Sequence, residues 1–196
     1  MAAMACTIFY GHLLWRIKPG AVTALKPQTE KREMRNADII QQKIYSLADI
    51  RRETGRWKFL GKKIAFTNGC FDILHEGHIF SLSQAAKEAD VLIVGVNSDA
   101  STKRLKGPSR PINNEHSRAL LIASLLMVDA VVVFEEDTPL EIIKLIMPDT
   151  IVKGGDYTIE QIVGAKEVIA NGGRVVINPI VQGFSTTGLI EKIHTL

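Results

Sequence analysis

The stretch Thr67-Asn68-Gly69-Cys70-Phe71-Asp72-Ile73-Leu74-His75-Glu76-Gly77-His78 decides how this chain folds. It follows a short apolar run, Ile64 to Thr67, and leads into a helical pattern that extends to about Ala89. A strand, a turn and a helix in this order begin an α/β unit. The turn therefore lies at the carboxyl end of a strand, where open parallel sheets bind their ligands.

The same alternation continues to the end of the chain. Apolar runs that predict strands cover 91–96, 130–134, 150–153 and 174–177, and helical patterns cover 114–127, 139–147, 165–170 and 186–193. The run 91–96 is apolar or glycine at every position, as in a strand buried on both faces. Five short strands separated by helices predict an α/β fold, a Rossmann-like, doubly wound parallel sheet of five strands in a single domain.

Two regions precede the first strand. Residues 38–54 carry isoleucines at helical spacing, with Gly55 near a stop, and predict a leading amphipathic helix. Residues 1–36 show no sustained period, and the first 29 positions hold no acidic residue. We interpret 1–36 as an N-terminal extension, disordered or upstream of the true start, and 37–196 as the functional domain. A targeting segment is the alternative, because transit peptides are also poor in acids.

Composition and charge exclude several classes of protein. Of 196 residues, 46% are hydrophobic and 23% charged, close to the average of globular proteins. Residues 1–33 account for the net charge of +3, and the other residues comprise 19 basic and 19 acidic ones. A neutral body argues against nucleic-acid binding, which needs uncompensated Lys and Arg. No apolar run approaches the roughly 20 residues of a membrane span, so we expect a cytoplasmic protein without membrane partners.

His75 and His78 flank Gly77 at the predicted start of a helix. The first N–H groups of a helix are unpaired and carry partial positive charge, so an anion can bind there. Gly77 lets phosphate oxygens approach the backbone, and both histidines can donate to one polyphosphate. A zinc site is a weaker interpretation, because zincins need histidines four apart and no third ligand stands nearby. We expect no metal ligands here; ordinary helix-start histidines remain the other alternative.

The run Gly69 to His78 resembles the G-x-F-D-x-x-H-x-G-H signature of the cytidylyltransferase-like nucleotidyltransferases. Gly183-Phe184-Ser185-Thr186-Thr187 resembles their second signature, I-S-S/T-T, at another helix start. The resemblance implies that hydroxyls of the second signature hold the β- and γ-phosphates of a nucleotide. Many members continue this signature with Ile-Arg, whereas Leu189-Ile190 stands here, which puts one cationic phosphate contact in doubt.

Three segments, 97–101, 105–112 and 152–157, narrow the resemblance to the heptose 1-phosphate adenylyltransferase branch. That branch implies transfer of AMP from ATP to D-glycero-β-D-manno-heptose 1-phosphate, giving ADP-heptose and pyrophosphate for lipopolysaccharide synthesis, with Mg²⁺ on the triphosphate. There the unit is usually the second half of a bifunctional enzyme whose first half is a sugar kinase. No kinase half is present in this sequence, so we expect the stand-alone form and a separate kinase as a pathway partner.

Cations near other strand ends suit an incoming phosphate. Lys103, Lys106 and Arg110 fall in a segment punctuated by Gly and Pro, which predicts either a loop that closes over phosphate or a solvated surface loop. Lys153 ends an apolar strand and precedes two glycines, so its side chain leaves the sheet at the ligand edge. Asp156 is expected to orient Lys153 or to accept a hydroxyl of the nucleotide or sugar.

These arguments give three groups of candidate residues. The catalytic candidates are His75, His78 and Lys153; the nucleotide-binding candidates are Asn68, Gly69, Cys70, Phe71, Asp72, Gly77, Asn97, Gly154, Asp156, Ser185, Thr186 and Thr187; the substrate-phosphate candidates are Lys103, Lys106 and Arg110. The base stays open, so a cytidylyltransferase acting on glycerol 3-phosphate or a similar alcohol phosphate is the nearest alternative. A non-catalytic nucleotide-binding module is an alternative of another class. ATP, the sugar 1-phosphate and a second copy of the chain are the further partners we expect.

Overall fold

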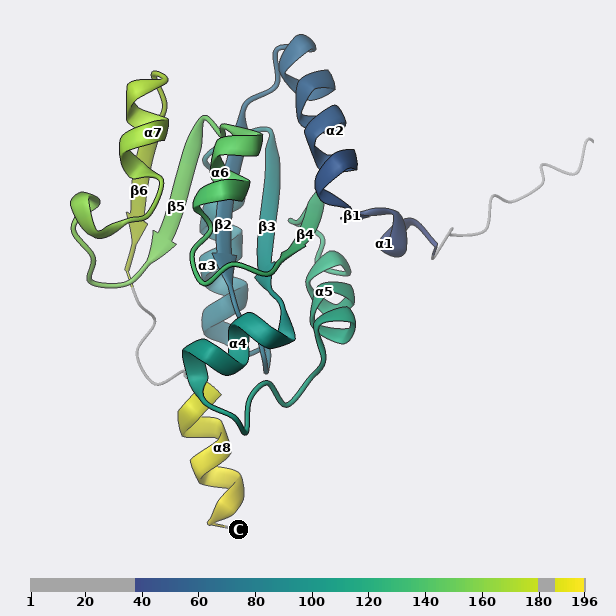
Figure 1. Ribbon diagram of the computed structural model, residues 1–196, viewed down its shortest axis with the longest axis vertical. Helices are drawn as coiled ribbons and strands as arrows, with labels where there is room; N and C mark the ends of the chain where they lie inside the picture. Colours follow the sequence, from purple (N-terminus) through teal and green to yellow (C-terminus); the bar gives the residue numbers. More distant parts are fainter. Residues whose placement is uncertain (1–37, 180–185, 196) are drawn as a thin grey trace, which may run out of the picture. The chain divides into compact units, whose positions relative to one another are not determined.

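The computed structural model describes residues 38–179 and 186–195 (Figure 1). The predictions for residues 1–36 lie outside these ranges. The strands are β1 (Ile44–Tyr45), β2 (Ile64–Gly69), β3 (Val91–Asn97), β4 (Ala130–Phe134), β5 (Thr150–Gly154) and β6 (Arg174–Asn178). The helices are α1 (Ile39–Gln42), α2 (Leu47–Phe59), α3 (Glu76–Ala86), α4 (Asp99–Lys106), α5 (Glu115–Ala123), α6 (Leu140–Ile146), α7 (Ala165–Ala170) and α8 (Thr186–His194), with one 3₁₀ turn, η1 (Ile159–Gln161).

The described strands form one parallel sheet in the order β1-β4-β3-β2-β5-β6, and helices cover both of its faces. Successive strand residues point to opposite faces. In β3, Val91 and Ile93 pack with α2, α6 and α7, whereas Leu92 and Val94 pack with α3 and α5. All of β3 is buried, which confirms the predicted strand with two covered faces. The predicted α/β fold is confirmed, but the sheet has six strands rather than five.

The prediction of one helix over 38–54 is wrong. The chain forms α1, pairs β1 with β4 through Ile44 and Val131, and begins α2 after Ser46. The Ser46 hydroxyl accepts a hydrogen bond from the Asp49 amide at 3.1 Å, which satisfies a free N–H of the first helical turn. Because β1 has only two residues, its own pattern is too short to reveal a strand within a helical spacing.

The strand order places a reversal at β2. The chain runs from β2 to β3 and β4 on one side, and then returns to β5 and β6 on the other side of β2. Open α/β sheets bind ligands at such a reversal, outside the carboxyl ends of the strands. Asn68 and Lys153 stand at these ends of β2 and β5. Figure 1 shows α4 and α8 beyond the same edge of the sheet.

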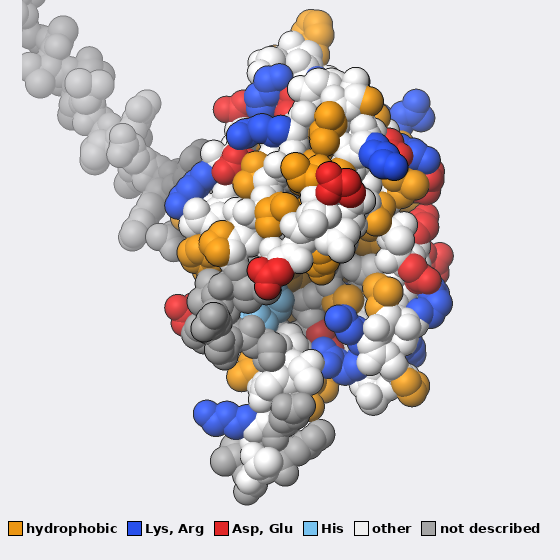
Figure 2. Space-filling view, turned by 90° about the vertical axis from the view of Figure 1, so that its left-hand side faces the viewer, with side chains coloured by type: hydrophobic (Ala, Val, Ile, Leu, Met, Phe, Trp, Pro, Cys, Tyr) orange, Lys and Arg blue, Asp and Glu red, His pale blue; other side chains and the backbone are white. Residues whose placement is uncertain are grey.

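The surface agrees with the charge balance of the sequence. On the face drawn in Figure 2, Lys and Arg side chains are interspersed with Asp and Glu. That face shows no continuous basic area of the kind that phosphate backbones require. Within the described ranges, no helix is long and apolar enough to cross a membrane.

Gly95 offers a test of the packing beneath the cleft. A Cβ atom there would stand 2.9 Å from Phe66 Cζ and 3.2 Å from Phe134 Cε1, both in buried rings. We therefore expect Gly95→Ala to lower the free energy of unfolding by about 1–3 kcal/mol in urea denaturation. Gly55→Ala in α2 is the matched control, because its Cβ would meet nothing within 4 Å. It should stabilise the protein by about 0.5–1 kcal/mol. Equal effects of the two substitutions would contradict this packing.

Candidate active site

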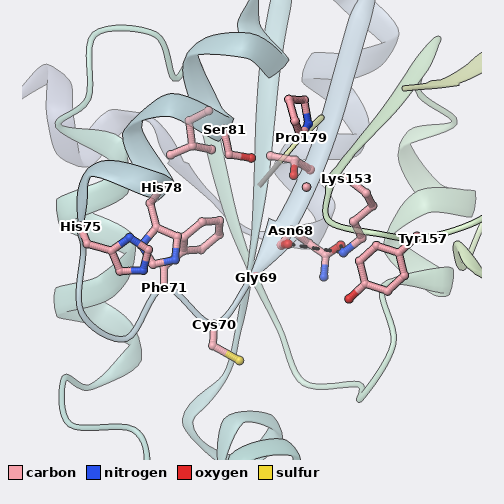
Figure 3. Close-up of a pocket in the computed structure, with 14 residues that line it drawn as sticks. Asn68, Gly69, Cys70, Phe71, His75, His78, Ser81, Lys153, Tyr157 and Pro179 are labelled. Atoms are coloured by element: carbon pink, nitrogen blue, oxygen red, sulfur yellow. Dashed lines mark hydrogen bonds between the residues drawn. The ribbon is translucent and has the colours of Figure 1, made fainter. Parts of the chain in front are cut away.

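A cleft opens at the carboxyl edge of the sheet, between β2 and β5 (Figure 3). Two cavities of about 360 Å³ and 580 Å³ make up the cleft and have eight wall residues in common. Both are lined by residues 68–71, at the end of β2 and in the turn that follows, by His75 and His78, and by Lys153 and Tyr157. The fold therefore brings together the two segments to which the sequence assigns catalytic residues.

The rings of His75 and His78 are stacked at the start of α3. Their centroids are 3.8 Å apart, with 21° between the planes, and the Phe71 ring meets His78 edge-on at 5.2 Å. Burial, followed by the neighbouring His75 ring, lowers the pKa of His78 to about 4. Burial also lowers the pKa of His75. Both rings are therefore mainly neutral at pH 7, and the stack avoids the repulsion between two imidazolium ions.

The β2–α3 turn that carries these rings has an uncommon backbone at Phe71. Its φ of +47° lies in the left-handed region, which bulky side chains rarely adopt. Gly69 leaves room for the ring, because a Cβ there would stand 3.2 Å from it. The fully buried Arg118 donates from Nη1 to the Cys70 carbonyl at 2.5 Å. These contacts hold the Phe71 ring against His78.

Asp72 occupies a structural position within the predicted nucleotide site. It is only 2% exposed, and its carboxylate accepts from the amides of Ile112 at 2.7 Å and Asn113 at 3.0 Å. The Arg110 side chain donates to it from Nε at 2.5 Å. Asp72 thus ties the segment 107–113 to the β2–α3 turn. Arg110 also lines the 580 Å³ cavity.

Lys153 lies across the cleft from the histidines. Its Nζ donates to Asn68 Oδ1 at 2.7 Å, and Figure 3 shows this bond. Burial lowers the pKa of Lys153 to about 8, so the ammonium form still dominates at pH 7. Gly154 follows it, and a Cβ at Gly154 would stand 3.3 Å from Ser81 Oγ. The glycine keeps the space between β5 and α3 open.

The prediction of a cationic loop over 103–110 is wrong for its first part, which is helical. The α4 helix starts after Ser98, whose hydroxyl accepts from the Ser101 amide at 3.1 Å, and ends at Gly107. Lys103 and Lys106 lie in its last turn, where cations complement the negative end of the helix dipole. Lys106 lines the 580 Å³ cavity, whereas Lys103 is exposed and is not a wall residue of the cleft.

The second signature borders the same cleft. Thr186 and Thr187 begin α8 and line the 580 Å³ cavity together with the histidines. The Thr186 hydroxyl donates to the Ile73 carbonyl at 3.4 Å, which connects α8 with the β2–α3 turn. Ser185 lies outside the described residues. The described part of the second signature therefore faces the first one.

Of the remaining nucleotide-binding candidates, three line the cleft and one does not. Gly77 and Gly154 line the 360 Å³ cavity. Asn97 lines the 580 Å³ cavity, although its side-chain amide already donates to Ser101 Oγ at 3.0 Å. Asp156 is exposed and is not a wall residue of either cavity, so the structure does not bring it together with the others.

Three residues that shape the site are not among the sequence-predicted candidates. Ser81 lines the 360 Å³ cavity and follows His78 by three positions, a spacing that keeps both on one helix face. Tyr157 lines both cavities and follows the glycines after Lys153. Arg118 is buried with Ala119 and Ile122 on the inner face of α5. A single arginine at a core position of an apolar helix was the available signal.

The chain is similar to several known proteins. The family model described as cytidylyltransferase-like matches residues 66–192. The chain is 55% identical over 143 residues to the bifunctional protein HldE of Mesorhizobium japonicum. This match covers 73% of this chain and 29% of that protein. It is 45% identical over 197 residues to HldE of Rhodospirillum rubrum, covering 98% and 39% of the two chains. The chain thus spans well under half the length of these curated relatives.

Two solved structures are also similar. The lipopolysaccharide core biosynthesis protein of Thermoplasma volcanium is 34% identical with a TM-score of 0.50, and the match covers 62% of this chain and 98% of that one. The pantoate–β-alanine ligase of Francisella tularensis is 16% identical with a TM-score of 0.51 over 78% of each chain, a likeness of fold alone. The family match extends from β2 to α8 and includes both signatures. This chain therefore belongs to the cytidylyltransferase-like family.

Proposed function

We propose that this chain is a nucleotidyltransferase that transfers AMP from ATP to D-glycero-β-D-manno-heptose 1-phosphate and releases ADP-heptose and pyrophosphate. The observation that carries the proposal is the stacked pair His75 and His78 facing Lys153 across one cleft. The family supports the reaction type, and the segments that resemble the heptose branch support the acceptor. The Thermoplasma relative, a lipopolysaccharide core biosynthesis protein, supports the same pathway. A sugar kinase activity would supply the acceptor in the cytoplasm.

The reaction requires no nucleophile from the protein. An oxygen of the sugar phosphate, already ionised at pH 7, attacks the α-phosphorus of ATP. The bond from this phosphorus to the bridging oxygen breaks, and pyrophosphate leaves with the electron pair. The protein must therefore position two polyanions and stabilise charge that grows on the α-phosphate and the leaving oxygen. His75 and His78 stabilise that charge by donating hydrogen bonds. Thr186 and Thr187 hold the β- and γ-phosphates, and Lys153 binds the phosphate of the incoming sugar.

Neutral histidines suit this task. A neutral imidazole still donates one hydrogen bond, and it does not carry a cation into a buried wall. Within the described ranges, Nδ1 of His78 is buried without a hydrogen-bond partner. A bound triphosphate raises the pKa of both rings, because a nearby anion favours the charged form. The rings can therefore be neutral in the empty site and still donate hydrogen bonds to a bound phosphate.

A divalent cation would enter the cleft with the triphosphate. Among the residues that the structure describes, no three His, Cys, Asp or Glu side chains are grouped to hold a metal ion. Mg²⁺ in nucleotide sites is commonly bound by substrate oxygens and water with few protein ligands. The cleft fits such a cation as part of its substrate, where it would neutralise phosphate charge.

Pyrophosphate release distinguishes the proposed activity from its alternatives. The protein is incubated with ATP or CTP and with heptose 1-phosphate or glycerol 3-phosphate. We expect release with ATP and the heptose phosphate only. Release with CTP and glycerol 3-phosphate would replace the proposed substrates. Calorimetric nucleotide binding without turnover on any acceptor would indicate a binding module.

His78 provides the first mutational test. We expect His78→Ala to lower kcat by about 10²-fold or more, the usual loss for a removed charge-stabilising donor. His116→Ala, at an exposed histidine of α5, is the matched control and should keep the wild-type rate. Melting temperatures establish that both variants fold. A loss of less than about tenfold for His78→Ala would show that the assigned role is wrong.

The pKa of Lys153 predicts that kcat/KM depends on pH. With a pKa of about 8, the free enzyme carries the ammonium below that pH and loses it above. We therefore expect kcat/KM for the sugar phosphate to fall on the alkaline side of pH 8, since this quantity reports ionisations of the free enzyme. Lys153→Arg stays charged past pH 11 and should remove the decline, even with a lower rate. Lys103→Arg, the control, should retain it. If kcat/KM still declines above pH 8 in Lys153→Arg, the ammonium of Lys153 is not the group that binds the sugar phosphate.

A further inference from the structure

A third cavity lies beside the cleft, beyond Lys153 and Tyr157. Its volume is about 180 Å³, and Pro139, Gln161, Ile162 and Val163 complete its walls. Lys153 and Tyr157 are the wall residues that it shares with both cavities of the cleft. Figure 3 shows these two side chains on the side of the cleft opposite the histidines. They therefore separate the third cavity from the space that the histidines face.

Gly155 makes room for the Tyr157 ring. Gly155 has a φ of +134°, and a Cβ there would stand 2.7 Å from Tyr157 Cε2. The ring thus lies directly against the backbone that follows β5, where a side chain at Gly155 would displace it. Tyr157 nevertheless stays 51% exposed. A half-exposed aromatic ring at a cavity wall offers an apolar contact surface for a ligand.

The walls of the third cavity combine apolar surface with one oriented amide. Pro139, Ile162 and Val163 supply the apolar part. The Oε1 atom of Gln161 accepts from the Thr158 amide at 2.9 Å, which orients the side chain and leaves its NH₂ group as the donor. Small-molecule pockets have this composition, with mainly apolar walls and a few placed polar groups. A sugar ring fits it, because its C–H faces are apolar and its hydroxyls form hydrogen bonds.

We propose that the third cavity is the acceptor subsite, in which the sugar ring of the sugar 1-phosphate lies against Tyr157 with a hydroxyl on Gln161 and its phosphate on Lys153. This assignment rests on the proposed function. It gives the two polyanions separate places, the nucleotide beside the histidines and the acceptor beyond Lys153. In-line displacement at phosphorus needs the attacking and leaving oxygens on opposite sides. An acceptor that approaches from the Lys153 side meets this requirement.

Two substitutions test the subsite. Val163→Trp fills the cavity, whereas Gln161→Glu keeps an oxygen for the Thr158 amide and removes the NH₂ donor. We expect each to raise the KM for heptose 1-phosphate by about tenfold or more and to leave the KM for ATP within about twofold. Ala48→Trp is the matched control, because it fills a separate cavity of about 330 Å³ between α2 and α6. It should change neither KM, and melting curves should show all three variants folded.

Calorimetry with heptose 1-phosphate alone gives a readout that does not depend on turnover. Binding by the wild-type protein that weakens about tenfold in Val163→Trp and Gln161→Glu supports the subsite, even where pyrophosphate release refutes the proposed reaction. Unchanged affinity in a folded Val163→Trp or in Gln161→Glu overturns the subsite and leaves the reaction standing if turnover occurs. A KM for ATP that rises as much as that for the sugar phosphate also overturns it, because the cavity would then serve the nucleotide. A wild-type protein that neither binds nor converts the sugar phosphate refutes both.

Discussion

The left-handed backbone at Phe71 is the constraint on which the cleft depends. This conformation costs a bulky residue on the order of 1–3 kcal/mol, so the surrounding contacts must hold it. Three of them do so from different parts of the chain: Gly69 leaves space for the ring, Arg118 binds the preceding carbonyl, and the Asp72 carboxylate anchors the turn to residues 107–113. In this conformation the Phe71 ring lies edge-on to His78, and the imidazole stack faces the reversal of the sheet. A relaxed turn would lose the support behind the stack.

The sheet topology explains why the rest of the site gathers there. The ends of β2 and β5 are neighbours only because the chain returns across β2, and this return brings Lys153 within 2.7 Å of Asn68. The hydrogen bond from the lysine offsets part of the cost of burying an ammonium group. The start of α8 completes the opposite border through the contact of Thr186 with Ile73. The strand order, and not the position of Lys153 along the chain, therefore brings this side chain into the site.

Hydrophobic pattern and signature spacing predicted the parallel sheet and the place of His75, His78 and Lys153, because each depends on local sequence: a strand end, a helix start, a pair of glycines. The errors have a different origin. The α4 helix follows a capping serine but consists mostly of polar residues, so the sequence shows no apolar periodicity from which a helix could be predicted. Asp72 was assigned to the nucleotide because it lies in the first signature. Its actual partners stand about 40 positions further along the chain, and only the tertiary structure brings them to it. Arg118 was missed for the same reason, since its three acceptors come from separate segments.

The distribution of charge across the cleft follows from the substrates it is proposed to hold. The sugar phosphate carries about two negative charges and the α-phosphate of ATP about one, so at about 5 Å they repel each other by on the order of 7 kcal/mol at an effective dielectric constant near 20. A cation between them reduces this repulsion, and Lys153 lies between the histidine cleft and the third cavity. It must be charged before both substrates are bound, which a pKa of about 8 allows at neutral pH. The histidines have the opposite requirement: a buried, permanently cationic pair would repel itself in the empty site. The lowered pKa values keep both rings mainly neutral in the empty site, while Lys153 in the same cleft stays charged.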